Sequence, residues 1–378
     1  MIIKKIIFIS FMIAVICFSY LNASDKINEK WLTSNEVHIG YINTDQRAAG
    51  LSMWTSNLYS KAKYRSNDRS LVSFKSEVMY VDYQYKHNTV EKPNNKIASP
   101  IIVIDELYYK YLINNRLAFI VGKIDFRTDN GSIVTLPQDR QNSINPLMSN
   151  YVADGAYLSY HSGKYITSIG VLSKGALFNS IIIGEDNMNR TVYDKLYGVS
   201  LLSNYKDETN SFSFNYFNVN GTLNNGKIIK SNIYGFNYIN DQSMNSGNTY
   251  YLYGAYSDTV EGTEKYTGYA GIIGANKLFD LPYIRRDVTV GIETMILKDD
   301  FVSLNTGRFI STYSMCKNGL QLTTYMDIVA TNRLHLKFRF SRFIPDGKVI
   351  NLDSSLERVR DNSLEELNDL RIELQYKF

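Results

Sequence analysis

Few side chains in this sequence stand at the spacings that bond-making chemistry requires. The four histidines are scattered singly, and no two of them have the spacing of a zinc site: His38, His87, His161 and His335. The Gly-x-Ser-x-Gly pattern, phosphate-binding loops of the Walker type and dinucleotide-binding glycine patterns are also absent from the sequence. We therefore expect no catalytic residues, no metal and no cofactor, and we predict that the chain is not an enzyme.

The most regularly spaced charged side chains are basic, and the chemistry that they offer is electrostatic. His335, Lys337 and Arg339 stand at alternate positions, with apolar residues between them. Alternate side chains of a β-strand share one face and lie about 7 Å apart. The row is consistent with a basic ladder that guides carboxylates or phosphates, and equally with the general polarity of a water-facing surface.

Alternation with a period of two runs along most of the chain, so these residues must be carried by strands. In the last nine residues the apolar positions alternate with charged or amide ones: Leu370, Ile372, Leu374, Tyr376 and Phe378. About seventeen such segments, each of roughly nine to twelve residues, extend from Glu36 to the end of the chain. That length suits a strand crossing a bilayer at a tilt, whereas strands of globular proteins are usually shorter.

Composition agrees with a sheet protein. The 378 residues include 30 Tyr and 18 Phe but only 6 Pro, and aromatic side chains suit a pleated surface. The 41 basic residues exceed the 37 acidic ones by four without forming a basic block, so we expect no nucleic-acid partner. Only Cys316 remains beyond the N-terminal segment, which excludes an internal disulfide.

A sheet in lipid satisfies every backbone polar group only by closing into a barrel, and bacterial single-chain barrels have an even number of strands. The sequence therefore predicts an all-β, transmembrane antiparallel β-barrel. Eighteen strands are favoured and sixteen are possible. The expected extra strand would lie in Gly175 to Arg190 or in Asn225 to Ser231. Clusters such as Tyr108, Tyr109 and Tyr111, and Tyr250, Tyr251 and Tyr253, are expected to form the aromatic girdles of such a barrel.

The first 23 residues are predicted to be a secretory signal peptide. Lys4 and Lys5 precede an apolar run from Ile6 to Leu21, and Ala23 gives way to polar residues. An N-terminal membrane anchor is the alternative, because the run could nearly span a bilayer. With cleavage after Ala23, residues 24–378 would form one barrel domain.

Two parts of the chain resemble known families: its last strand and the stretch from Asp105 to Tyr157. Its last strand, with Tyr376 and terminal Phe378, is similar to the sorting signal that the outer-membrane assembly machinery reads in Gram-negative barrel proteins. More narrowly, the stretch from Asp105 to Tyr157 resembles OprD-type porins and the major outer membrane porins of epsilonproteobacteria. The resemblance rests on Asp105-Glu-Leu-Tyr-Tyr-Lys-Tyr111, Leu117 to Lys123 with Gly122, Asp139-Arg140, Pro146 and Asp154-Gly-Ala-Tyr157. It implies eighteen strands, frequent trimers and a long third loop that folds inward to narrow a pore.

The predicted third loop, from Asp125 to Asp154, carries charges of both signs. We expect its charged residues to line a constriction that screens solutes by charge: Asp125, Arg127, Asp129, Asp139, Arg140 and Asp154. The alternative is a solvated surface loop on which mixed charge only aids solubility.

These observations favour a porin of the bacterial outer membrane that admits small hydrophilic solutes and ions. The expected partners are outer-membrane lipid, lipopolysaccharide, the assembly machinery and two further copies in a homotrimer. The runner-up is a barrel that anchors external loops as an adhesin or surface-binding protein. Charge reversal at Arg339 or Arg140 is expected to change ion selectivity without preventing assembly.

Overall fold

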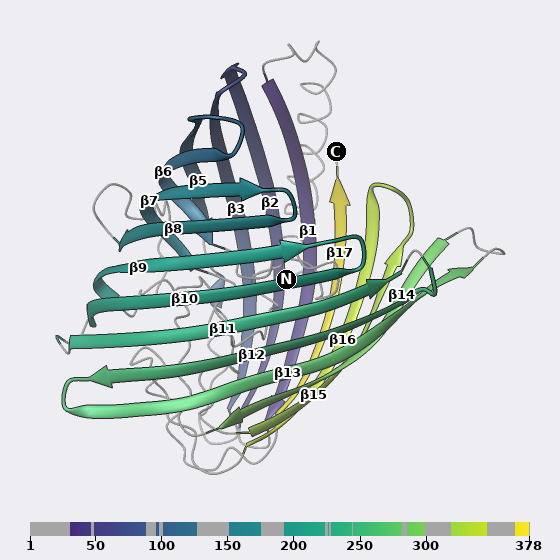
Figure 1. Ribbon diagram of the computed structural model, residues 1–378. Helices are drawn as coiled ribbons and strands as arrows, with labels where there is room; N and C mark the ends of the chain where they lie inside the picture. Colours follow the sequence, from purple (N-terminus) through teal and green to yellow (C-terminus); the bar gives the residue numbers. More distant parts are fainter. Residues whose placement is uncertain are drawn as a thin grey trace.

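The computed structural model describes most of the segments in which the sequence alternates. The described residues are 31–46, 49–87, 96–97, 101–126, 151–174, 193–223, 226, 228–243, 245–281, 286–298, 319–345 and 367–377. Within them the chain forms a single sheet in which every paired strand runs antiparallel to its neighbours (Figure 1). The predicted signal peptide, residues 1–23, lies outside the described residues.

The strands follow one another in chain order. They are β1 (Trp31–Gln46), β2 (Ala49–Asn67), β3 (Ser70–His87), β4 (Lys96–Ile97), β5 (Ile101–Leu112), β6 (Leu117–Phe126), β7 (Tyr151–Ser162), β8 (Tyr165–Lys174), β9 (Tyr193–Lys206), β10 (Asn210–Leu223), β11 (Ile228–Gln242), β12 (Asn248–Glu261), β13 (Glu264–Leu281), β14 (Arg286–Lys298), β15 (Gly319–Val329), β16 (Leu334–Pro345) and β17 (Leu367–Lys377). No helix in these parts of the chain is long and apolar enough to cross a membrane.

The sheet closes on itself between its first and last strands. β17 pairs with β16 on one side and with β1 on the other, and β1 also pairs with β2 (Figure 1). The two-residue β4 pairs only with β3, which bonds β5 directly, so β4 is not a member of the ring. The described residues therefore confirm the predicted antiparallel barrel, with sixteen strands.

The favoured count of eighteen is wrong, because neither expected extra strand has a place in the ring. Residues 228–231 are the start of β11, and β8 pairs directly with β9 across the segment 175–192. Strand lengths also differ from expectation: they reach 19 residues in β2 and 18 in β3 and β13. A strand that continues beyond the hydrocarbon region needs no alternation of apolar and polar residues there. The period-two pattern therefore does not show where such a strand ends.

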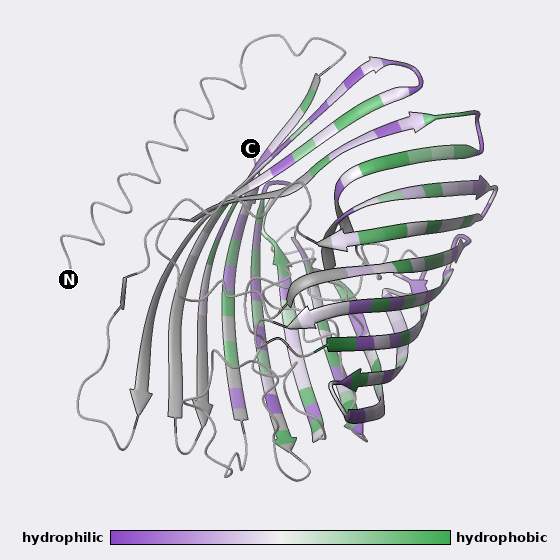
Figure 2. Ribbon diagram, turned by 90° about the vertical axis from the view of Figure 1, so that its left-hand side faces the viewer, coloured by the Kyte–Doolittle hydropathy of each residue, from purple (hydrophilic) through white to green (hydrophobic). Residues whose placement is uncertain are grey.

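Alternation places apolar side chains outside and polar ones inside along β16 and β17. Leu370 and Ile372 are each 38% exposed, while Glu373 and Gln375 are buried. The same alternation of hydrophilic and hydrophobic residues is visible along the strands in Figure 2. An apolar outer face and a polar inner face are what a barrel in lipid requires.

From β10 to β14 the inner face also carries large apolar residues. Phe217, Ile233, Tyr253 and Met295 belong to β10, β11, β12 and β14, and each is less than 2% exposed. Their sequence neighbours point outward, as the exposure of Tyr234, Leu252 and Ile296 shows. The inner face of this wall is therefore partly apolar.

Tyrosines on the outer face form rows along the cross-strand register. On β10, β11 and β12 the ring centroids of Tyr216 and Tyr234 lie 5.0 Å apart, and those of Tyr234 and Tyr256 lie 6.2 Å apart. Of the clusters expected to form girdles, Tyr109, Tyr111 and Tyr250 are exposed on the outside. Tyr251 and Tyr253 are instead buried on the inside.

The turn between β9 and β10 is closed by a carboxylate. Asp207 Oδ1 accepts hydrogen bonds from the backbone N–H groups of Asn210, at 2.6 Å, and Thr209, at 3.0 Å. Tyr205 donates its hydroxyl to Asp207 Oδ2 at 3.0 Å. The bonds from Asn210 and Thr209 hold the pKa of Asp207 below its ordinary value.

We expect Asp207→Ala to lower the urea midpoint for unfolding at neutral pH, because the turn loses its acceptor. A group with a lowered pKa stabilises the folded state above its unfolded pKa of about 3.9, and this stability disappears as the pH falls through the folded value. The difference between wild type and variant should therefore shrink on acidification. A difference that stays constant down to about pH 2 would contradict this account.

Candidate functional site

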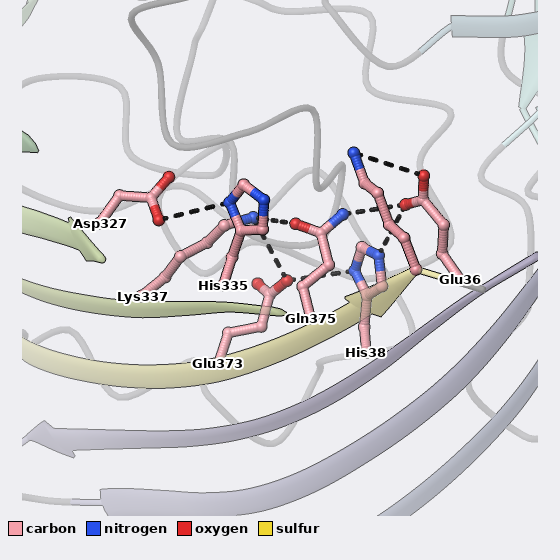
Figure 3. Close-up of polar contacts among 8 residues, drawn as sticks. Glu36, His38, Asp327, His335, Lys337, Glu373 and Gln375 are labelled. Atoms are coloured by element: carbon pink, nitrogen blue, oxygen red, sulfur yellow. Dashed lines mark hydrogen bonds and ion pairs between the residues drawn. The ribbon is translucent and has the colours of Figure 1, made fainter. Parts of the chain in front are cut away.

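An extended polar network lies on the inner wall where the ring closes. It is built by alternate residues of β15, β16, β17 and β1, which the register places at neighbouring positions (Figure 3). Lys337 is the cross-strand partner of Glu373, and Gln375 stands between His335 on one side and His38 on the other. We call the following eight residues the seam network: Glu36, His38, Asp327, His335, Lys337, Glu373, Gln375 and Lys377.

Lys337 is held by two groups of β17. Its Nζ donates to Gln375 Oε1 at 2.6 Å and lies 3.8 Å from Glu373 Oε1. Gln375 in turn donates its amide N–H to Glu36 Oε2 at 2.9 Å, and Lys377 Nζ is 3.7 Å from the other oxygen of Glu36. Because Lys337 is only 3% exposed, its charge depends on these partners rather than on water.

Each histidine of the seam network lies beside a carboxylate. His38 stands between two of them, with Nε2 3.2 Å from Glu36 Oε2 and Nδ1 3.1 Å from Glu373 Oε1. His335 Nδ1 is 3.8 Å from Asp327 Oδ1. In Figure 3 these side chains form a chain of contacts that crosses from β15 to β1. Positive and negative groups are therefore interleaved along this wall.

A second cluster surrounds Arg339, which lies further along β16 from the turn between β15 and β16 than the seam network does. Arg339 Nη2 lies 3.4 Å from Glu293 Oε1 on β14, and Glu293 Oε2 accepts a hydrogen bond from the hydroxyl of Tyr251 at 2.9 Å. The hydroxyls of Tyr251 and Tyr325 are 3.4 Å apart, and Asn276 donates its amide N–H to Tyr325 at 3.1 Å. Arg339 is 6% exposed, so its guanidinium belongs to this buried cluster.

Glycines on neighbouring strands make room for these inward tyrosines. Gly274 is the cross-strand partner of Tyr251, and Gly291 is the partner of Tyr325. A Cβ at Gly274 would lie 2.2 Å from Cζ of Tyr251, and one at Gly291 would lie 2.1 Å from Cζ of Tyr325. The rings therefore rest against bare backbone and keep close to the wall.

The predicted basic ladder is found on the inner face, but its members are neutralised by neighbours. Lys337 contacts Glu373, Arg339 contacts Glu293, and His335 contacts Asp327. Six members of the seam network were not predicted from the sequence: Glu36, His38, Asp327, Glu373, Gln375 and Lys377. Glu36 and His38 meet β17 only because the ring closes and brings β1 against it.

The six residues predicted to form a constriction do not all lie in one loop. Asp125 lies in β6 and Asp154 in β7, not in the connection between them. Asp154 is the cross-strand partner of Lys123, and both are buried. The four other predicted constriction residues lie outside the described residues: Arg127, Asp129, Asp139 and Arg140.

Of the predicted assembly signal, Tyr376 stands in β17 opposite Val37 of β1, and Phe378 lies outside the described residues. Across the described part of the chain, no group of three potential metal ligands comes together.

Comparison with known proteins shows the fold. No protein-family model and no curated protein matches the chain. Among solved structures it is similar to the high-pH form of Pseudomonas putida OprB, at 9% identity and a TM-score of 0.55, covering 92% of this chain and 94% of that one. An anion-selective porin from Comamonas acidovorans matches at 9% identity and a TM-score of 0.52, covering 92% and 99%.

A third similar structure is Vibrio cholerae OmpT, an outer membrane protein solved in a trimer form, at 8% identity and a TM-score of 0.51, covering 93% of this chain and 100% of that one. At sequence identities this low, the similarity shows a shared fold but assigns no role to any residue. The chain therefore has the fold of outer-membrane barrel proteins, porins among them.

Proposed function

We propose that this chain is a porin of the bacterial outer membrane, through which small hydrophilic solutes and ions diffuse passively. The observation that carries the proposal is the closed sixteen-stranded ring with apolar residues outside and the charged seam network inside. Barrels of about sixteen strands are wide enough for an aqueous channel. The proposal assigns the protein no chemical step and no cofactor.

The remaining expectations belong to the same proposal. Residues 1–23 would be removed as a signal peptide, and the mature barrel would sit in outer-membrane lipid and lipopolysaccharide, as a homotrimer. The stretch from Asp105 to Tyr157 keeps its resemblance to OprD-type and epsilonproteobacterial porins. The ring of sixteen strands departs from the eighteen that those families form, so the general porin class is the proposal.

Planar-bilayer recording with the purified mature protein tests the channel. We expect stepwise conductance increments, each corresponding to insertion of open barrels. An adhesin whose barrel is closed would give no steps, although it would insert into the same bilayers. A barrel that inserts without conducting would therefore contradict the porin function and favour the surface-binding alternative.

Assembly gives an independent prediction. Deleting Phe378, or replacing it by a polar residue, should lower the amount of protein in the outer membrane, because the terminal aromatic residue resembles the sorting signal. Immunoblots of fractionated membranes measure this, with Tyr165→Phe, a mild change on the outer face, as the control. Wild-type levels after deletion of Phe378 would argue against the sorting role.

A further inference from the structure

A second row of basic residues lies on the inner face of β2. Lys61, Lys63 and Arg65 occupy alternate positions after Tyr59. The ring of Tyr59 packs with its centroid 4.7 Å from that of His38, an inward member of the seam network. Since alternate residues of a strand share a face, the three basic residues face inward as well.

Two neighbouring strands add to this row. Lys75 of β3 is the cross-strand partner of Lys61, and its Nζ lies 5.5 Å from the ring centroid of Tyr59. Lys110 of β5 stands between Tyr109 and Tyr111, whose outward exposure directs Lys110 to the inside. We call Lys61, Lys63, Arg65, Lys75 and Lys110 the lysine wall.

The lysine wall differs from the β16 ladder in its acidic surroundings. By register, three carboxylate residues adjoin it on the inner face: Glu106 opposite Lys75, and Glu77 and Glu36 opposite Tyr59. Five basic residues therefore stand beside three acidic ones, and Glu36 already contacts Lys377 and His38. Between the described side chains, no ion pair involves Lys63, Arg65 or Lys110, whereas each cation of the β16 ladder contacts a carboxylate.

Lys63, Arg65 and Lys110 have no carboxylate residue opposite them in the register: their cross-strand partners are Leu32, Ser73, Leu71 and Ile120. Neighbouring basic residues of the row are about 7 Å apart, which is less than the Debye length of about 8 Å at physiological ionic strength. Their potentials therefore add along the wall.

We propose that the lysine wall binds small carboxylate and phosphate anions as they cross the barrel, and that it makes the channel prefer anions to cations. The inference rests on the proposed porin function and names its solute class. It moves the anion-guiding surface from β16, where the charges are neutralised, to β2, β3 and β5. Solutes interact with the wall by charge alone, so no single anion is selected.

The test compares the mature wild-type protein with a Lys61→Gln, Lys63→Gln, Lys110→Gln triple variant in planar bilayers. Lys75 is left unchanged because it packs over Tyr59. From reversal potentials in potassium chloride gradients around 0.1 M, we expect the anion-to-cation permeability ratio to fall by about threefold in the variant. Inorganic phosphate should reduce the chloride current of the wild type more than that of the variant.

Measurements at high salt separate an effect of charge on selectivity from an effect of pore shape. At about 1 M salt the Debye length is only about 3 Å, so the two proteins should become nearly equally selective. A difference that persists at high salt would mean that the substitutions altered the pore itself, and it would overturn the proposal. Lys230→Gln is the matched control: Lys230 is exposed on the outer face of β11, and its loss should leave selectivity unchanged.

The two proposals fail in different ways. A conducting wild type whose selectivity and phosphate sensitivity are the same in the triple variant overturns the role of the lysine wall and leaves the porin function intact. A wild type that inserts without any conductance overturns both. Equal migration of wild-type and variant protein on unheated gels verifies that the variant barrel is folded.

Discussion

Alanine at Gly274 and at Gly291 is expected to destabilise the barrel by about 1–3 kcal/mol per site, the usual cost of overpacking. The added Cβ atoms would meet the rings of Tyr251 and Tyr325 at 2.2 Å and 2.1 Å, so each ring must leave the wall. Moving Tyr251 also breaks its hydrogen bond to Glu293, which then keeps Arg339 as its only partner in this cluster.

Gly271→Ala provides the control, because its Cβ would come no closer than 3.8 Å to any atom, an ordinary contact distance. Urea titrations of the refolded proteins in detergent, followed by the shift between folded and unfolded bands on unheated gels, measure the change. Displaced rings would also point into the channel, so single-channel conductance should fall together with stability. Midpoints equal to that of Gly271→Ala would show that the tyrosines do not need these glycines.

Removing the central carboxylate of the seam network should have the largest single effect. Glu373→Ala is expected to destabilise the barrel by about 3–5 kcal/mol, the typical cost of leaving a buried ion-pair partner uncompensated. Glu373 is 5% exposed and lies 3.8 Å from Lys337 and 3.1 Å from His38, so Lys337 loses its counter-charge and His38 loses one of its two carboxylate neighbours.

A double variant separates the charge from the packing. Glu373→Leu combined with Lys337→Met replaces the pair by apolar residues of similar volume, and such replacements are often nearly neutral. We therefore expect the double variant to regain most of the urea midpoint lost in Glu373→Ala. A double variant that is as unstable as the single one would show that the uncompensated charge of Lys337 is not what destabilises Glu373→Ala.

The sequence predicted the fold best where the two faces of a strand differ most. In β17 the apolar and polar residues alternate without exception from Leu370 to Lys377, so both the strand and the direction of its faces follow from the sequence. In β12 the run Tyr250-Tyr251-Leu252-Tyr253 is apolar on both faces. Alternation disappears there, and the inward position of Tyr251 and Tyr253 depends on pairing that only the folded sheet establishes.

The candidate site was predictable in part for the same reason. Alternation placed His335, Lys337 and Arg339 on one face, because a strand's own geometry determines this. Their partners come from other strands: Glu293 is 46 residues from Arg339 in sequence, and Glu36 is 339 residues from Gln375. Cross-strand register and ring closure decide such contacts, and neither is encoded locally.

Closure of the ring at β1 and β17 also constrains how the protein can fold. All other neighbours in the ring are consecutive strands joined by a single connection, and can zip together as hairpins soon after they are made. The last rungs, such as Glu36 opposite Lys377, must wait until nearly the whole polypeptide is in place. The entropy of closing so long a loop makes this step slow. Until then two unsatisfied edges remain, each a template for pairing with another chain.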